Sequence, residues 1–125
     1  MKGFRKAEAI EMDPVDVAWL AGLLEGEGSF MRLKRQGGRP DHGRVSVFMT
    51  DRDVLERVVA ITGCGNVRQV VNRGNLGSKP IFCWMTSRLR DVETICLAVR
   101  PFMGVRRTAA IDSVLSLCEE RFAAA

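Results

Sequence analysis

The sequence predicts an α+β fold in which helices cover one face of a four-stranded antiparallel sheet. Two observations carry this prediction: the element order is αββαββα(α), and the pair of alternating segments occurs twice, each time around a glycine-containing connection. Such a sheet keeps its other face open. With 125 residues and one set of such elements, we expect a flexible N-terminal arm over 1–12 and a single domain over 13–125.

The first helix should run from Pro14 to about Gly26. Asp13 can accept hydrogen bonds from the free amides of the first turn, and proline suits the first helical position. The segments 29–35 and 44–50 then alternate in character and flank the connection QGGRPDHG, which predicts a hairpin.

The remaining elements each carry a local signal. TDRDVLERVVAITG opens with Thr50 and Asp53 at capping-box spacing and stops at Gly63, which predicts a helix. The segments 66–72 and 80–86, joined by RGNLGSK, predict a second hairpin. Two more helices follow, since apolar residues recur at helical spacing before Pro101 and again from about Val105.

The composition limits the function classes that fit this chain. It is 46% hydrophobic and 27% charged, which argues against disorder, and no apolar run approaches the roughly 20 residues that span a bilayer. The net charge of +4 favours a polyanionic partner. Cys64, Cys83, Cys96 and Cys118 lack metal-binding spacing, so we expect reduced core thiols in a cytoplasmic protein.

Small residues form a stripe along the first helix. Ala18, Gly22 and Gly26 recur at intervals of four, although each helical glycine costs about 0.5–1 kcal/mol relative to alanine. The stripe therefore indicates close packing against another backbone. Two partners are open: the same helix of a second copy about a twofold axis, or the sheet of the same chain.

Two acids, Glu25 and Glu27, stand at the end of this helix. A carboxylate there opposes the helix dipole at about 0.3–1 kcal/mol, and a twofold axis would bring two copies of Glu27 together. Two such charges about 4 Å apart repel by on the order of 4 kcal/mol at an effective dielectric of about 20. A divalent cation, by default Mg²⁺, would remove the repulsion, whereas the alternative is a solvated turn residue.

The segment LAGLLEGEG resembles the nine-residue motif of the LAGLIDADG homing endonucleases. The matching residues are Leu20, Ala21, Gly22, Leu23 and Gly28, with acids at both acidic positions. The element order is also that of the family, and RPFMGVRRTA is similar to the segment before its last helix. The resemblance implies a saddle-shaped sheet and a single-motif homodimer that cuts double-stranded DNA at a pseudo-palindromic site with Mg²⁺. It also implies an intron, intein or phage mobile element, in a bacterium or a phage.

The resemblance implies roles for five residues in the active site. Glu27 would bind the catalytic metal together with the carbonyl of Gly26, and Glu25 would be a supporting residue. Arg106 stands where the family often has a lysine, with Arg107 as its alternative; arginine stabilises phosphate charge but transfers protons poorly. The competing function is a non-cleaving DNA-binding regulator or an RNA-binding intron maturase of the same fold.

The open face of the sheet should contact DNA. Alternation turns Arg44, Ser46 and Phe48 outward, whereas Phe82 and Trp84 are expected in the core. Arginine and asparagine are side chains that read base edges in the major groove. The predicted DNA-binding set is Ser29, Arg32, Lys34, Arg35, Arg44, Ser46, Asn66, Arg68, Asn72 and Lys79.

The first strand allows two registers. Simple alternation exposes Phe30, Arg32 and Lys34, whereas the resemblance buries Phe30 and turns Ser29, Met31, Leu33 and Arg35 toward DNA. A bulge would reconcile the two. His42 is expected in the loop, at most as a phosphate contact.

Overall fold

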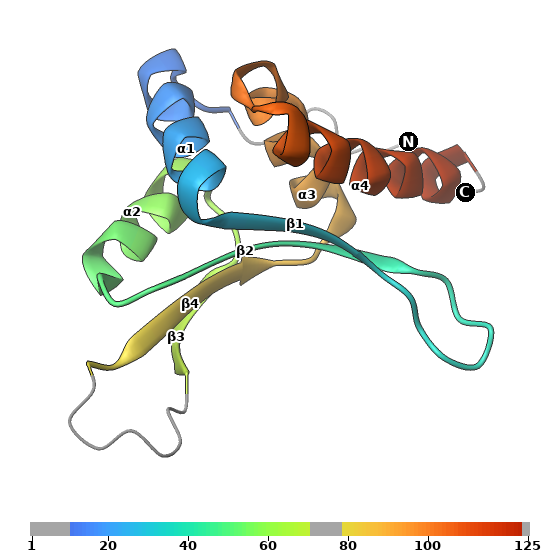
Figure 1. Ribbon diagram of the computed structural model, residues 1–125, viewed down its shortest axis with the longest axis horizontal. Coiled ribbons are helices and arrows are strands. Elements are labelled where there is room, and N and C mark those ends of the chain that lie inside the picture. The colour runs from blue at the N-terminus through green and yellow to red at the C-terminus, as the bar shows by residue number, and fades with distance from the viewer. Residues whose placement is uncertain (1–10, 71–78, 124–125) are drawn as a thin grey trace.

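A computed structural model describes residues 11–70 and 79–123, and its elements follow the predicted order (Figure 1). They are α1 (Pro14–Glu27), β1 (Gly28–Leu33), β2 (His42–Met49), α2 (Arg52–Thr62), β3 (Asn66–Val70), β4 (Ile81–Thr86), α3 (Leu89–Val99), the 3₁₀ helix η2 (Arg100–Phe102) and α4 (Val105–Ala123). The predicted arm falls mostly on residues 1–10, outside the described residues, and stays a prediction.

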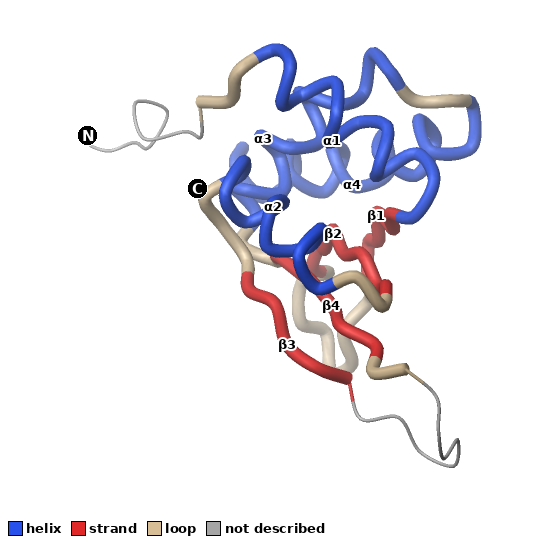
Figure 2. The backbone as a smooth tube through the Cα atoms, turned by 90° about the vertical axis from the view of Figure 1, so that its left-hand side faces the viewer, coloured by secondary structure: helices blue, strands red, loops and turns tan. Residues whose placement is uncertain are grey.

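The four strands form one antiparallel sheet in the order β1-β2-β4-β3. The helices gather on one side of it and the other side is open, as predicted (Figure 2). The sheet twists so that β1 and β2 extend one way and β3 and β4 the other, which gives the saddle shape (Figure 1). The second hairpin therefore pairs with the first through β2 and β4, the two central strands.

The core lies between the sheet and the helices. Leu20 and Leu24 of α1 pack there with Val45 and Val47 of β2, and all four are fully buried. Trp84 of β4 is also fully buried, and its indole Nε1 donates a 3.0 Å hydrogen bond to a backbone carbonyl in the α2–β3 connection. The largest core side chain thus has its polar atom satisfied, as a buried indole requires.

Gly65 leaves no room for a side chain beside this indole. A Cβ there would lie 2.6 Å from Nε1 of Trp84 and 2.7 Å from the carbonyl oxygen of Met85, on a backbone with φ of +76°. Gly65→Ala should therefore lower the free energy of unfolding by about 2 kcal/mol, measured by urea denaturation. Gly63→Ala is the control, since its φ is +68° but its surroundings are open; an equal loss in both variants would contradict the clash.

Helix boundaries follow the predicted signals with one exception. Asp13 caps α1 by accepting a 3.0 Å hydrogen bond from the Val15 amide, and Gly63 ends α2 in the left-handed conformation. The capping box from Thr50 is wrong, because α2 begins after Asp51 and no side chain caps it. A backbone bond from the Val54 amide to the Asp51 carbonyl closes that first turn instead.

All four cysteines are free, and three of them are buried in the described structure. Burial raises the pKa of Cys96 to about 12 and that of Cys118 to about 11, so both stay protonated thiols at neutral pH. In the described part of the chain, no helix has the length and apolar character needed to cross a bilayer.

Candidate functional site

The end of α1 carries Glu27 to the junction between the helices and the sheet. Both Gly26 and Glu27 are exposed there, and the chain enters β1 at Gly28 without a loop. A Cβ on Gly28 would lie 2.7 Å from a methyl carbon of Leu24 and 2.8 Å from its carbonyl oxygen, so only glycine fits this direct connection. The connection thereby fixes the backbone of Glu27 relative to the sheet.

Glu25 supports this junction instead of facing solvent with Glu27. Its Oε1 accepts a 2.8 Å hydrogen bond from the amide of Gly104, the residue before α4. Its carbonyl oxygen accepts a 3.0 Å bond from Nε of Arg107. The carboxylate therefore sits at the positive end of the α4 dipole and ties α4 to the end of α1.

Replacing these two acids should have opposite effects on stability. Glu25→Ala should lower the free energy of unfolding by about 1 kcal/mol, since the first turn of α4 loses a charged acceptor. Glu27→Ala should leave it unchanged or raise it by a few tenths of a kcal/mol, because its carboxylate opposes the α1 dipole. Thermal unfolding without metal or DNA measures both, and a larger loss for Glu27→Ala would contradict the assignment.

The two candidate arginines differ in environment. Arg107 is half-buried and holds the carbonyl of Glu25, whereas Arg106 is exposed. The structure thus brings Arg107 into direct contact with the motif helix, and the role predicted for Arg106 stays a prediction. Both lie in the first turn of α4, next to the Gly104 amide that the Glu25 carboxylate binds.

β1 has the register that buries Phe30. Phe30 pairs with Val45 and is 6% exposed in the core, whereas Met31 pairs with Arg44 and is 39% exposed. Ser29, Met31 and Leu33 therefore share the open face, and no bulge is needed in this ladder.

Arg32 lies on the helix-covered side, which corrects its predicted place among the DNA-facing residues. Its guanidinium bonds Asp41 at 2.8 Å and Glu120 of α4 at 2.9 Å. The same guanidinium holds the pKa of the Asp41 carboxyl below its usual range, and Arg121 donates to the Asp41 carbonyl. This network anchors the base of the β1–β2 hairpin to α4. Arg32 therefore stabilises the fold, and its guanidinium is not directed toward DNA.

The rest of the predicted DNA-binding set is divided by the structure. Arg68, Asn66 and Lys79 are exposed, and Arg44 is half-buried on the open face. Ser46 shares that face but is only 3% exposed, which corrects the expectation that its hydroxyl is available to a ligand. Asn72 lies outside the described residues.

His42 is the first residue of β2, which corrects its predicted place in the loop. Its Nδ1 accepts a 2.9 Å hydrogen bond from Nε of Arg35, a residue that follows β1 together with Lys34. Burial, Arg35 and Arg44 lower the pKa of His42, so the imidazole is neutral at pH 7.

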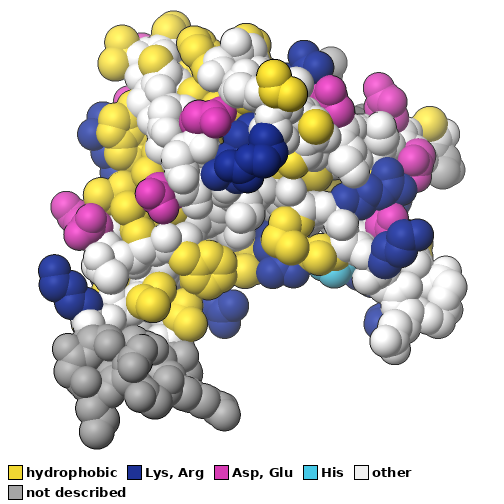
Figure 3. Space-filling model, viewed as in Figure 1, with side chains coloured by type: hydrophobic (Ala, Val, Ile, Leu, Met, Phe, Trp, Pro, Cys, Tyr) yellow, Lys and Arg dark blue, Asp and Glu magenta, His cyan; other side chains and the backbone are white. Residues whose placement is uncertain are grey.

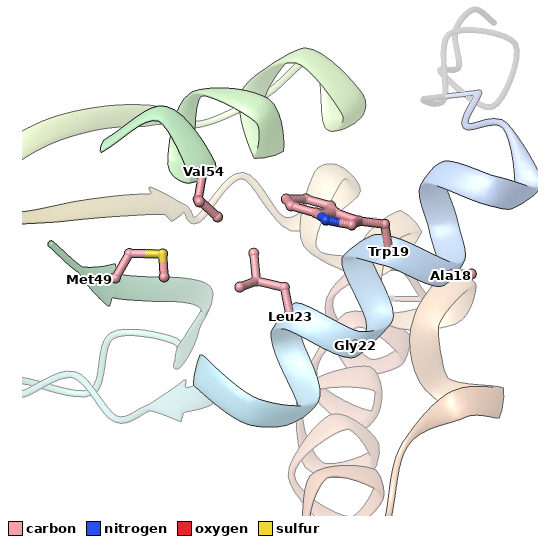
Figure 4. Close-up of a pocket in the computed structure, with 6 residues that line it drawn as sticks. All are labelled: Ala18, Trp19, Gly22, Leu23, Met49 and Val54. Carbon is pink, nitrogen blue, oxygen red and sulfur yellow. The ribbon is translucent and has the colours of Figure 1, made fainter. Parts of the chain in front are cut away.

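The small stripe of α1 faces away from its own chain. A Cβ on Gly22 or Gly26 would meet no atom within 4 Å in the described structure, which excludes the alternative that the stripe packs on its own sheet. Ala18, Gly22 and Leu23 instead border a shallow apolar hollow that Trp19, Met49 and Val54 complete (Figure 4). Helix α1 is therefore apolar on its buried face and on an unpartnered face as well.

Comparison with solved structures shows what this architecture is similar to. The homing endonuclease I-CvuI, in complex with its target in the presence of Ca, superposes with a TM-score of 0.63 at 20% identity, over 86% of this chain and 71% of that one. The LAGLIDADG homing endonuclease I-GzeII, in complex with a DNA target, gives 0.68 at 18% identity over 91% of this chain and 39% of that one. The intron-encoded I-CeuI, complexed with DNA, gives 0.68 at 15% over 90% and 58%. No family model and no curated protein matches the sequence.

The chain has the LAGLIDADG homing endonuclease fold. Its αββαββα order and open antiparallel sheet are those of the solved structures to which it is similar, and the chain spans 71% of I-CvuI but only 39% of I-GzeII. The likeness therefore confirms the predicted fold class.

The oxygen donors at the end of α1 fit a hard cation in part. The carboxylate of Glu27 is exposed, and the carbonyl of Gly26 belongs to the last turn, whose carbonyls have no donor within the helix. Within residues 11–70 and 79–123, no group of three histidine, cysteine or acidic side chains could hold a metal alone. A metal bound here would need further oxygens from water, from a second copy or from a phosphate.

Sequence reasoning named Arg107 as a site residue but missed its contact with Glu25, and it did not single out Gly104. Gly104 and Arg107 approach Glu25 from 79 and 82 residues along the chain, and no local pattern links them. The only available signal was the basic segment before α4, which the resemblance singled out as a whole.

Proposed function

We propose that this chain is a site-specific DNA endonuclease that works as a homodimer with a divalent metal, Mg²⁺ by default. One observation carries the proposal: the motif helix ends on an exposed carboxylate, Glu27, where the helices meet an open sheet face that carries Arg44 and Arg68. A polyanion on that face would place its backbone near Glu27. Several solved structures of the same fold, among them I-CeuI and I-GzeII, are complexes with DNA, which supports this ligand class.

In the proposed reaction each residue of the junction has a separate task. Glu27 and the Gly26 carbonyl would hold the metal, and a bound divalent ion supplies an acidified water and charge stabilisation at the leaving oxygen. Arg106 would bear on the charge that develops at the scissile phosphate. Arg107 and Glu25 keep the ends of α1 and α4 together. The metal-binding groups on α1 and Arg106 on α4 would thereby keep their positions relative to one another.

The homodimer is proposed from the exposed stripe on α1. Because Gly22 and Gly26 face open space, a second copy of the helix can approach closely there about a twofold axis. Two copies would present two Glu27 carboxylates and two sheet faces, one for each half of a pseudo-palindromic target. The free thiols are consistent with a cytoplasmic site of action, which we also propose.

The proposal is tested with a pooled library of duplex targets. The protein is incubated with the library in Mg²⁺ and separately in Ca²⁺, and both the cut ends and the bound, uncut duplexes are sequenced. We expect cutting in Mg²⁺ at a pseudo-palindromic site and binding of the same site in Ca²⁺. Specific binding without cutting in either ion would favour a DNA-binding regulator, whereas preference for a structured RNA over every duplex would favour a maturase.

A further inference from the structure

The ladder of the sheet fixes which side chains share the open face. They are Ser29, Met31, Leu33, His42, Arg44, Ser46, Phe48, Asn66, Arg68, Val70, Ile81, Cys83 and Met85. Most of these strand residues are apolar, and none of them is a carboxylate. The underside of the sheet accordingly shows hydrophobic side chains next to basic ones (Figure 3). Such a surface combines cations, which attract a polyanion, with apolar groups, whose exposure to water is unfavourable.

Two of the apolar side chains stand out from this face. Phe48 is 49% exposed and Met31 is 39% exposed, whereas Cys83, opposite Phe48 in the ladder, is 1% exposed. An exposed phenylalanine in the middle of a sheet costs solvation that a polar residue would not. Its place on the face proposed to bind DNA suggests that the ligand covers it.

Cations lie beside both of these apolar groups. Arg44 pairs with Met31 in the β1–β2 ladder, and Arg68 pairs with Cys83 in the β3–β4 ladder. Both guanidinium groups are close enough to Cys83 to favour its thiolate, although burial still raises the pKa of the thiol overall. Phe48 therefore lies on a surface bordered by positive charge on both sides, which favours DNA over an apolar protein partner.

We propose that Phe48 and Met31 each recognise a thymine by packing on its 5-methyl group in the major groove, Phe48 between Arg44 and Arg68 and Met31 beside Arg44. The inference rests on the proposed function and adds a base preference to it. The 5-methyl group is the one apolar feature on the major-groove edges of the base pairs, and phenylalanine is among the side chains that contact it. The arginines would contact guanine or phosphate at neighbouring positions.

The test removes only the methyl group. The duplex selected in Ca²⁺ is resynthesised with each thymine replaced, one at a time, by deoxyuridine, which keeps every hydrogen-bonding group. For the wild-type chain we expect about fourfold weaker binding at each contacted thymine, the factor that corresponds to one buried methyl group at about 0.8 kcal/mol. Phe48→Ser and Met31→Ser should each bind the thymine and deoxyuridine duplexes equally at the position that the missing side chain contacts.

Leu97→Ser is the matched control, since this α3 leucine is 57% exposed in the helix layer and should retain the full sensitivity. Circular dichroism establishes that each variant is folded. If either Phe48→Ser or Met31→Ser does not fold, the other variant is used for the binding test. If the wild type bound every deoxyuridine duplex as tightly as the thymine duplex, the inference would be overturned, but the proposed endonuclease function would be unaffected. Failure to select any duplex would overturn the proposed function, and this inference with it.

Discussion

Glu27→Gln should abolish cleavage in Mg²⁺, with a loss of at least about a thousandfold in rate, and leave binding of the same duplex in Ca²⁺ within a factor of about three. The amide keeps the size of the side chain but removes the charge that would hold the metal. Because the residue is exposed at the end of α1 and lies beyond the core, its replacement should not disturb the sheet face. Single-turnover cleavage and a filter-binding titration measure the two quantities on one protein preparation.

Glu56→Gln provides the control for a lost surface charge. This α2 carboxylate is exposed and, among the described residues, forms its ion pair with Arg52, one turn away at 2.8 Å, so its replacement should change neither cleavage nor binding appreciably. Cleavage by Glu27→Gln at the wild-type rate would show that Glu27 is a solvated turn residue. Loss of binding together with cleavage would show that it acts on the DNA-bound structure and not on the chemistry.

Gly22→Leu should weaken the proposed dimer without destabilising the fold of the monomer. A Cβ added here would meet no atom within 4 Å beyond its own turn of helix, and removing a helical glycine should raise the free energy of unfolding of the monomer by about 0.5–1 kcal/mol. In the dimer the leucine would keep the two helices apart, at about 1–3 kcal/mol for each copy. The dimer should therefore dissociate at least about thirtyfold more readily, as measured by sedimentation equilibrium.

Ala60→Leu places the same side chain on an exposed position of α2 and should leave the association constant unchanged. The stability of each monomer is followed by urea denaturation at low protein concentration, so that dimer loss is not mistaken for unfolding. An unchanged association constant for Gly22→Leu would place the dimer interface elsewhere. Loss of DNA cutting should accompany loss of the dimer, since each copy supplies one Glu27.

Local signals predicted the fold because they depend on neighbouring residues. Asp13 before Pro14 and Gly63 after α2 act within one helical turn, and both behave as expected. The capping box failed for a local reason as well, since the helix begins one residue later than Thr50 would need. Helix boundaries of this kind shift by a residue when backbone bonds close the first turn.

The register of β1 was beyond local reasoning. Simple alternation that buries Met31 and Leu33 would have exposed Phe30, but Gly28 joins α1 directly to β1 and so sets which face Phe30 takes. The open face itself carries apolar side chains beside its polar and basic ones, and a rule that assigns apolar residues to the core misreads such a strand. The register also places Arg32 in an ion-pair network with Asp41 of the same hairpin and with Glu120, which is 88 residues away along the chain and carries no local signal.

The hydrogen bond between Glu25 and Gly104 should also couple the local opening of two helix ends. It joins two segments 79 residues apart, and Arg107 adds a second bond at the same place. Fraying of the first turn of α4 would therefore release the last turn of α1, and the two segments should exchange their amide hydrogens as one cooperative unit. The Gly104 amide, bonded to the acid two residues from Glu27, would then report by its exchange rate the fraction of molecules in which the site is assembled.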